Sequence, residues 1–249
     1  MNAIAGLIVA ATCLAASAAL AQAPRVVMEE MMVPSEPGID IYVRNKRPAD
    51  MTTFRPERTV LYVHGATYPA STAFDLKLGG LSWMDYMAAR GYDVYLLDLR
   101  GYGKSTRPKE MSEDPKNNPP IVRGDTAVKD IGAVVDFILK RRNIPRVNLM
   151  GWSWGTTTMA TYTTQNPGKV ERLVLYAPQW IRQTASLVQA EWDRDLPPYM
   201  AQTLFPLLVN SPGKRYGQLP EGTHTIIMEK NRLMLFEAVQ AFLDEAGRS

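Results

Sequence analysis

Short apolar runs alternate with segments of helical spacing along most of the chain. From residue 59 onward the runs are nearly continuous, as in strands whose two faces are both buried. The runs predict strands at 25–33, 39–44, 59–63, 93–98, 147–151, 172–177 and 214–219. Helical spacing of apolar residues predicts helices at 81–90, 125–142, 156–165 and 229–246. We therefore expect an α/β fold: a mostly parallel, doubly wound sheet with helices on both faces.

The segment 107–124 interrupts this pattern. It is rich in proline, asparagine and charged residues, and it follows the strand expected at 93–98. Open α/β sheets place their sites outside the carboxyl ends of their strands. Two interpretations remain open: the segment is an inert surface insertion, or it lines the functional site.

The first 23 residues contain no charged side chain and end in the small-residue patterns Ala-Leu-Ala and Ala-Gln-Ala. They predict a secretory signal peptide at 1–23, cleaved after Ala21 or Ala23, followed by one domain at 24–249. A transmembrane anchor is the alternative, because no Lys or Arg precedes the apolar stretch. We expect a secreted or periplasmic protein without stable membrane insertion after cleavage.

The composition is that of an ordinary globular protein, with 46% apolar and 21% charged residues. The net charge is only +3, and no Lys/Arg cluster forms a stripe, so nucleic acid is not an expected partner. The single cysteine, Cys13, lies in the expected signal peptide. The mature chain would therefore have no disulfide, no thiolate nucleophile and no zinc site built on cysteine. These features leave the oligomeric state open.

The sequence Gly151-Trp-Ser-Trp-Gly155 follows an expected strand and precedes an expected helix. In this context Gly-x-Ser-x-Gly predicts a nucleophile elbow, a strained turn that exposes the hydroxyl of Ser153 above the sheet. The alternative is a serine that lies between two glycines by chance. The strand before it and the helix after it favour the elbow.

Two backbone amides are candidates to bind an oxyanion. The amide of Trp154 opens the helix after the elbow, and the amide of Ala66 follows the expected strand at 59–63 in the sequence YVHGATYP. Gly65 permits the chain to leave that strand sharply. We interpret His64, beside this glycine at a strand end, as structural.

The other histidine of the chain is His224, in the sequence LPEGTHTIIMEKNR. It follows the last expected strand and precedes the last expected helix, which puts it on the same sheet edge as Ser153. A neutral imidazole there would accept the serine proton and return it to the leaving group. The alternative is a histidine in a surface loop.

Four sequences in this order, YVHGATYP, YDVYLLDLRGYGKSTRP, VNLMGWSWG and EGTHT, resemble the α/β-hydrolase superfamily. The closest resemblance is to its secreted or periplasmic serine hydrolases, which include esterases and lipases. The resemblance runs from about residue 25 to near the end of the chain. It implies the chain order nucleophile, acid, histidine, with Ser153 first and His224 last. Haloalkane dehalogenases share this architecture but have aspartate at the elbow, so Ser153 argues against that activity.

The same resemblance implies an acid in the sequence AEWDRDLP. Asp193 is preferred because the acid of the family often precedes a proline by four residues, and Pro197 fits this spacing. Glu191 and Asp195 remain possible. The role of the acid would be to hold the tautomer of His224 and to stabilise its imidazolium form.

The approach to Asp193 departs from the family, whose members usually carry a helical cap at this place. Only the sequence QWIRQTASLVQAEW separates Pro178 from Asp193. A parallel crossover normally needs a dozen or more residues before the second strand begins, so there is room here for a linker or a strand but hardly for both. We infer that the cap is absent, and we expect part of the strand before Asp193 to be absent as well. Leu187-Val188 is the only apolar pair available for it. Whether this is a natural minimal hydrolase or a shortened form of a capped parent stays open.

These features predict a serine hydrolase that cleaves carboxylic esters, small or polymeric, through an acyl-enzyme. A lactone, a thioester or a peptide is an alternative substrate for the same triad. A catalytically silent binding domain or a deletion-damaged hydrolase is the alternative from another class. The aromatic residues expected to line the substrate site, with Trp154, are Tyr68, Trp180 and Trp192.

No metal or organic cofactor is expected, because the sequence has no cluster of metal ligands and no dinucleotide-type glycine loop. The sequence GYGKS at 101–105 lacks the spacing of a phosphate-binding loop and is interpreted as a turn.

Overall fold

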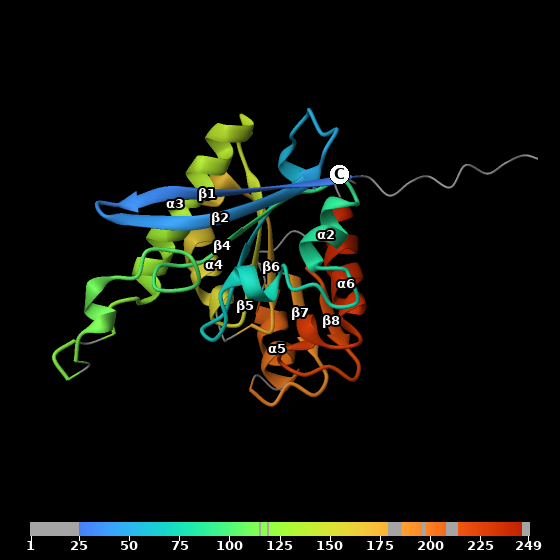
Figure 1. Ribbon diagram of the computed structural model, residues 1–249. Helices are drawn as coiled ribbons and strands as arrows, with labels where there is room; N and C mark the ends of the chain where they lie inside the picture. The colour runs from blue at the N-terminus through green and yellow to red at the C-terminus, as the bar shows by residue number, and fades with distance from the viewer. Residues whose placement is uncertain are drawn as a thin grey trace, which may run out of the picture.

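An eight-stranded sheet runs through the protein in the order β1-β2-β4-β3-β5-β6-β7-β8 (Figure 1). The computed structural model describes residues 25–114, 116–118, 120–178, 186–195, 198–207 and 214–245. The strands are β1 (Val26–Glu36), β2 (Ile39–Pro48), β3 (Thr59–Val63), β4 (Asp93–Leu97), β5 (Val147–Trp152), β6 (Val170–Tyr176), β7 (Ser186–Ala190) and β8 (Tyr216–Leu219). The first two form an antiparallel hairpin, β2 pairs antiparallel with β4, and the remaining neighbours are parallel.

Helices cover both faces of this sheet (Figure 1). They are α1 (Ala70–Ala73), α2 (Trp83–Ala88), α3 (Gly124–Arg142), α4 (Trp154–Gln165), α5 (Pro198–Leu204) and α6 (Arg232–Asp244). Short 3-10 turns occur at Pro56–Arg58, Lys109–Ser112, Pro167–Lys169, Phe205–Leu207 and Ile226–Met228. One buried apolar layer packs the sheet against α2 and α6, and a second packs it against α3 and α4. The predicted α/β class with a doubly wound, mostly parallel sheet is confirmed.

The strand β7 corrects one expectation. The prediction that the strand before Asp193 would be incomplete is wrong, because Ser186–Ala190 pairs in parallel with β6 on one side and β8 on the other. Weak apolar character did not prevent strand formation, since the backbone hydrogen bonds come from both neighbours. Nine residues, 177–185, link β6 to β7, so this link is too short for a helical cap domain.

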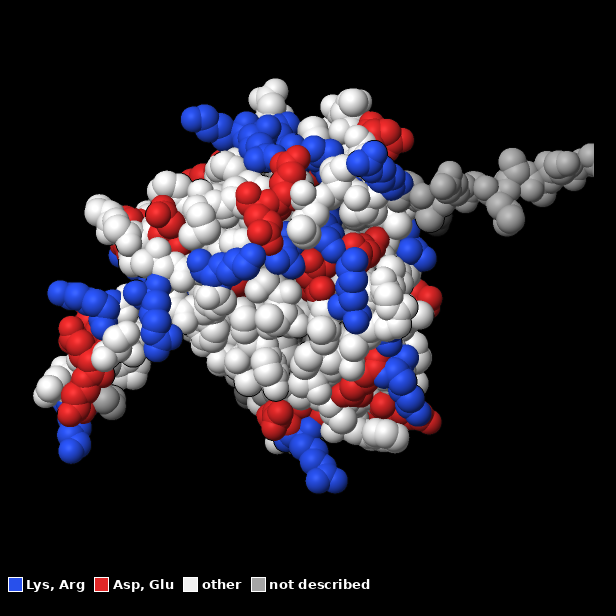
Figure 2. Space-filling model, in the orientation of Figure 1, with Lys and Arg blue, Asp and Glu red and all other residues white. Residues whose placement is uncertain are grey.

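The segment 107–124 leaves the body of the molecule as a long excursion between β4 and α3 (Figure 1, green). Figure 2 shows Lys, Arg, Asp and Glu together on its outer end, and a surface without these residue types in the middle of the same face.

The predicted signal peptide, residues 1–23, lies outside the described residues. Within the described part of the chain, none of the helices has the length and apolar character needed to cross a membrane.

Candidate active site

Ser153 occupies a strained turn between β5, which ends at Trp152, and α4, which begins at Trp154. Its φ of 54° and ψ of −121° are unusual for a residue with a side chain, so the turn carries backbone strain. Its N–H donates a hydrogen bond to the carbonyl of Tyr176 on β6 at 3.0 Å, which helps to hold the turn. The residue is 9% exposed. This is the local geometry predicted for a nucleophile elbow.

Gly155 allows α4 to lie directly against the end of β3. A Cβ atom at this position would come within 2.6 Å of the carbonyl oxygens of Val63 and His64, and both are backbone atoms. A side chain here would therefore push the helix away from the sheet. This contact fits the expectation from the sequence that the glycines of the motif let the following helix pack close to the sheet.

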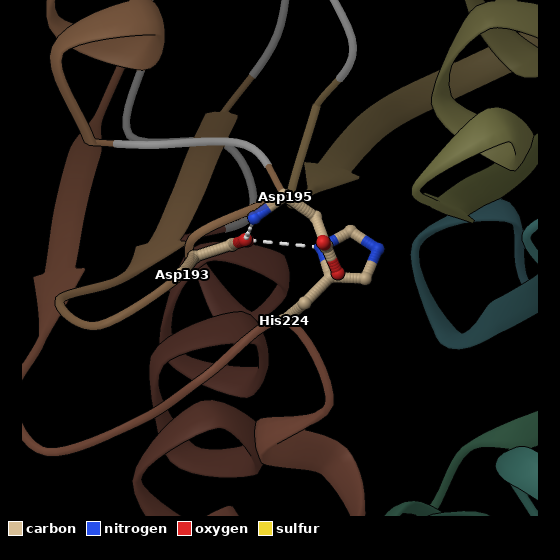
Figure 3. A group of neighbouring side chains, drawn as sticks. All are labelled: Asp193, Asp195 and His224. Atoms are coloured by element: carbon tan, nitrogen blue, oxygen red, sulfur yellow. Dashed lines mark hydrogen bonds and ion pairs between the residues drawn. The ribbon is translucent and has the colours of Figure 1, made fainter.

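His224 and Asp193 meet at the ends of the last two strands of the sheet. Asp193 follows β7 and His224 follows β8, and Asp193 Oδ2 lies 2.9 Å from His224 Nδ1 (Figure 3). Asp193 is 2% exposed, so its carboxylate is shielded from water. A carboxylate accepts the Nδ1 proton, which leaves Nε2 of a neutral imidazole as an acceptor. This is the tautomer that a general base requires.

The two other candidate acids occupy different positions. The backbone N–H of Asp195 donates to Asp193 Oδ1 at 3.0 Å, so Asp195 supports the first carboxylate (Figure 3). The carboxylate of Glu191 accepts a hydrogen bond from the N–H of Glu221 at 3.1 Å. The geometry therefore favours Asp193 as the partner of His224.

Asp193, Asp195 and His224 also form the one group of potential metal ligands among the described residues. One ligand atom from each lies within 4.8 Å of the others. Asp195 is exposed, and Nδ1 of His224 is engaged with Asp193. The hydrogen bonds within this group account for its compactness.

Two buried aromatic residues hold the backbone of the loop after β8, which carries His224. Trp152 Nε1 donates to the carbonyl oxygen of His224 at 3.2 Å, and the Tyr176 hydroxyl donates to the same oxygen at 2.8 Å. Both are the last residues of their strands. Sequence reasoning missed this role; the only signal was an aromatic residue at the end of each of two neighbouring buried strands.

The loop after β3 carries Ala66 and comes close to Ser153. A Cβ atom on Gly65 would lie 2.9 Å from Cβ of Ser153, so only glycine allows the loop to come this close. The Tyr102 hydroxyl donates to the carbonyl oxygen of Ala66 at 2.9 Å and fixes that peptide. Tyr102 lies in GYGKS, which forms a turn as predicted, and its positioning role was missed.

His64 is a structural residue within the loop. Its ring is fully buried, its Nε2 accepts from the N–H of Leu99 at 3.0 Å, and its Nδ1 lies 2.6 Å from the carbonyl of Gly65. Burial lowers the pKa of His64, which favours the neutral ring that this hydrogen-bond pattern needs.

A pocket of about 310 Å³ opens beside the two candidate oxyanion amides. The residues that line it are Ala66, Tyr102, Val122, Arg123, Gly124 and Trp154. Three of these residues close the segment 107–124. Of the two interpretations of that segment, the one in which it lines the candidate site therefore fits the structure.

The expected substrate-binding aromatics lie mostly at the surface. Tyr68 is 43% exposed and its ring stacks on Trp152 with the centroids 6.4 Å apart. Trp192 is 56% exposed, and its backbone N–H donates to the carbonyl of Gly222 at 2.7 Å. Trp180 lies outside the described residues.

Two solved structures, one of them named an esterase, have a similar fold. Est1E from Butyrivibrio proteoclasticus, with ferulic acid bound, has a TM-score of 0.68 and 14% identity, over 86% of this chain and 98% of that chain. The esterase EaEST from Exiguobacterium antarcticum has a TM-score of 0.64 and 14% identity, over 87% of this chain and 100% of that chain. At these identities the similarity shows the fold.

Curated relatives match over shorter stretches. Abhydrolase domain-containing protein abhd-5.2 from Caenorhabditis elegans is 32% identical over 85 residues, 34% of this chain and 17% of the relative. A proline iminopeptidase from Heyndrickxia coagulans is 29% identical over 119 residues, 48% of this chain and 34% of the relative. The matched regions thus span about a third or less of each relative.

A family model described as alpha/beta hydrolase fold matches residues 58–207, which is more than half of the 249 residues. The match includes the elbow at Ser153 and the candidate acid Asp193. The strand order and the elbow geometry agree with it. The chain belongs to the alpha/beta hydrolase fold family.

Proposed function

We propose that this protein is a serine hydrolase that cleaves carboxylic esters through a Ser-His-Asp triad. The observation that carries the proposal is the 2.9 Å hydrogen bond between buried Asp193 and His224, at the same sheet edge as the strained turn of Ser153. The structural similarity to Est1E and to the esterase EaEST supports the hydrolase class.

The proposed reaction proceeds in two halves. His224 Nε2 accepts the proton of Ser153 Oγ while the oxygen attacks the ester carbonyl and forms a tetrahedral intermediate. The intermediate collapses, the carbon–oxygen bond to the alcohol breaks, and His224 returns the proton to the departing alcohol. Water then attacks the acyl-enzyme with His224 as base, and the acid and free Ser153 are released.

The remaining groups stabilise the charges of these steps. The amides of Ala66 and Trp154 are proposed to donate hydrogen bonds to the oxyanion, a contribution worth about 3 kcal/mol per donor in serine hydrolases. Asp193 offsets the positive charge that develops on His224 and holds its tautomer. No step calls for a metal or an organic cofactor.

A silent or deletion-damaged domain is the competing proposal. It was favoured by the short connection to Asp193, and the complete pairing of β7 removes its main support. A damaged strand would displace the acid, whereas Asp193 lies within hydrogen-bonding distance of His224. The geometry therefore favours an active hydrolase.

The test is covalent labelling of the full-length protein with a fluorophosphonate probe, combined with turnover of p-nitrophenyl esters of increasing chain length. We expect labelling and turnover in the wild type, and neither in Ser153→Ala. Ser112→Ala, which changes an exposed serine of the segment 107–124, is the matched control and keeps both. Wild-type protein that is folded but neither labelled nor active would refute the proposal.

The same substrate panel should contain a lactone, a thioester and a peptide with a free amino terminus. The peptide is included because one curated relative is a proline iminopeptidase. We propose that the carboxylic esters give the highest kcat/KM. A higher value for any of the other three classes would replace the ester assignment while keeping the triad.

The cellular location is a separate proposal. We infer that residues 1–23 act as a signal peptide and that the mature enzyme is secreted or periplasmic. Expression of the full chain followed by intact-mass measurement is the test. We expect a mature terminus after Ala21 or Ala23, and an uncleaved membrane-bound chain would support the anchor alternative.

A further inference from the structure

The pocket beside the oxyanion amides lies on one side of Ser153, and His224 lies on the other. Ala66 and Tyr102 follow β3 and β4, which lie on the one side of β5 in the sheet. Asp193 and His224 follow β7 and β8, on the opposite side.

His224 does not line the pocket. Because His224 must reach the departing alcohol to protonate it, the alcohol lies on the β7 and β8 side. The pocket is then the space for the acyl group.

The volume of the pocket, about 310 Å³, is at the lower end of the range for small-molecule sites. Such a volume suits a short acyl group better than a long aliphatic chain.

Arg123 is the charged residue of this lining, and its guanidinium has donors to spare. Its Nε donates to the carbonyl oxygen of Pro120 at 3.1 Å, which keeps the side chain near the pocket. Arg123 is exposed, and none of the salt bridges between described residues includes it, although Asp125 is only two positions away. The buried arginines Arg100 and Arg142 differ, since each is paired with a buried aspartate.

A guanidinium with both terminal nitrogens available matches the two oxygens of a carboxylate. The positive end of α3, which begins at Gly124 in the same lining, adds to the attraction for an anion. The other lining side chains are Tyr102, Val122 and Trp154, with Ala66, and they offer no competing negative charge. The pocket thus combines a short apolar wall with one unpaired positive charge.

We propose that this pocket binds short acyl groups that end in a carboxylate, with Arg123 as the residue that selects them. The substrates would be half-esters of short dicarboxylic acids. This inference rests on the proposed esterase function and names the acyl class for the same site.

The test compares two ethyl esters of matched shape. Monoethyl glutarate carries the carboxylate, and ethyl isoheptanoate replaces its two oxygens by methyl groups. We expect wild-type protein to show the higher kcat/KM for monoethyl glutarate. Arg123→Gln should lower the ratio of the two kcat/KM values by about 10- to 100-fold, the range for loss of a charge-assisted hydrogen bond. Arg123→Lys should retain part of the ratio, because it keeps the charge without the planar fork.

Arg107→Gln is the matched control, since it removes a positive charge from the other end of the same segment. Arg107 donates to the carbonyl of Met111 and does not line the pocket. We expect Arg107→Gln to leave the ratio at its wild-type value. An equal fall in both variants would mean a general effect of surface charge and would overturn the assignment to Arg123.

A binding measurement separates this inference from the proposed function. Calorimetric titration of Ser153→Ala protein with monoethyl glutarate needs no catalysis. We expect binding that weakens with added salt and is lost in the double variant with Arg123→Gln. Absence of binding, or binding that Arg123→Gln leaves unchanged, overturns the proposal. If the fluorophosphonate probe labels the protein but the kcat/KM values show no preference for the half-ester, only this inference is refuted. The proposed esterase function would then stand.

Discussion

The hydroxyl of Tyr176 donates a hydrogen bond to the backbone carbonyl of His224 at 2.8 Å. The two residues lie 48 positions apart in the sequence, and the bond ties the end of β6 to the loop after β8. Tyr176 is fully buried, and burial is the main cause that raises its pKa well above the usual range, so it stays a donor at neutral pH. The position of the candidate base is therefore set from within the sheet.

The first prediction follows from this bond. Tyr176→Phe keeps the ring and removes the donor, so the loop of His224 loses one of its two anchors. We expect kcat to fall by about tenfold or more with little change in KM, because small misplacement of a base costs much of the rate. Steady-state kinetics on a p-nitrophenyl ester measure both constants. Tyr216→Phe, which removes a hydroxyl bonded to Gln218 at the surface, is the control, and an equal fall there would contradict the prediction.

A second tyrosine, Tyr102, holds the loop that carries Ala66, a candidate oxyanion donor. Tyr102→Phe removes the hydrogen bond to the carbonyl of Ala66, and the adjacent peptide becomes less well fixed. We expect the rate of fluorophosphonate labelling and kcat to fall together, by about 3- to 10-fold, as for loss of one neutral hydrogen bond. Tyr199→Phe, at an exposed position, should change neither. A lower kcat with an unchanged labelling rate would place the defect after the attack by Ser153.

The acid assignment predicts unequal effects at two neighbouring aspartates. Asp193→Asn would favour the wrong tautomer of His224 and should lower kcat by about 10³- to 10⁴-fold, as in other serine hydrolases. Asp195→Asn should have a much smaller effect, because Asp195 supports Asp193 through its backbone N–H. Parallel kinetics of the two variants decide between them. A loss at Asp195→Asn that equals or exceeds the loss at Asp193→Asn would overturn the assignment.

The close packing of α4 against the end of β3 at Gly155 predicts an effect on the free energy of unfolding. Gly155→Ala would place a methyl group 2.6 Å from two backbone oxygens, which cannot move without shifting the end of β3. We expect the free energy of unfolding to fall by about 1–3 kcal/mol, the usual cost of overpacking, as measured by urea denaturation. Gly168→Ala adds the same group where no atom lies within 4 Å, and it should be nearly neutral. Equal stability of the two variants would contradict the packing role.

The N-terminal hairpin predicts a pH-dependent stability. Glu30 accepts hydrogen bonds from Tyr42 and Arg44, which lower its pKa from 4.5 to about 2. A carboxyl with a lowered pKa stabilises the fold above its unfolded pKa, and this contribution is lost as the pH falls from about 4.5 towards 2. Because Glu30 is partly exposed, we expect a modest effect.

Glu30→Gln should flatten the decline of unfolding free energy in that acid range. Glu237→Gln, which changes an exposed carboxyl on α6, should leave the decline as in the wild type. Urea denaturation at a series of acidic pH values makes the comparison. An unchanged slope in Glu30→Gln would contradict the role of this carboxylate.

The sequence predicted the central elements well because buried parallel strands are continuous apolar runs. The strand β3 has the predicted bounds, and β4, β5 and α3 differ by one residue at an end. The strand β7 was underestimated, since its pairing depends on neighbours that are distant in sequence. The short helices α1 and α5 were missed because four and seven residues are too few to show a period.

Parts of the candidate site were also accessible from sequence, and others were not. The elbow has a local signature, and the scarcity of histidine left few choices for the base. The roles of Tyr102 and Tyr176 depend on single hydroxyls that reach backbone carbonyls 36 and 48 residues away. No local pattern encodes such a contact, so only the folded structure reveals it.

The order of strands places the residues of the candidate triad on both central and edge strands of the sheet. Ser153 follows β5, in the middle of the sheet. His224 follows β8, a four-residue edge strand. Edge strands separate from a sheet more readily than central strands, because fewer backbone hydrogen bonds must break. Catalytic competence would then depend on an edge strand that opens before the centre of the sheet does. Under mild denaturing conditions the chain would become inactive while its central strands still resist hydrogen exchange.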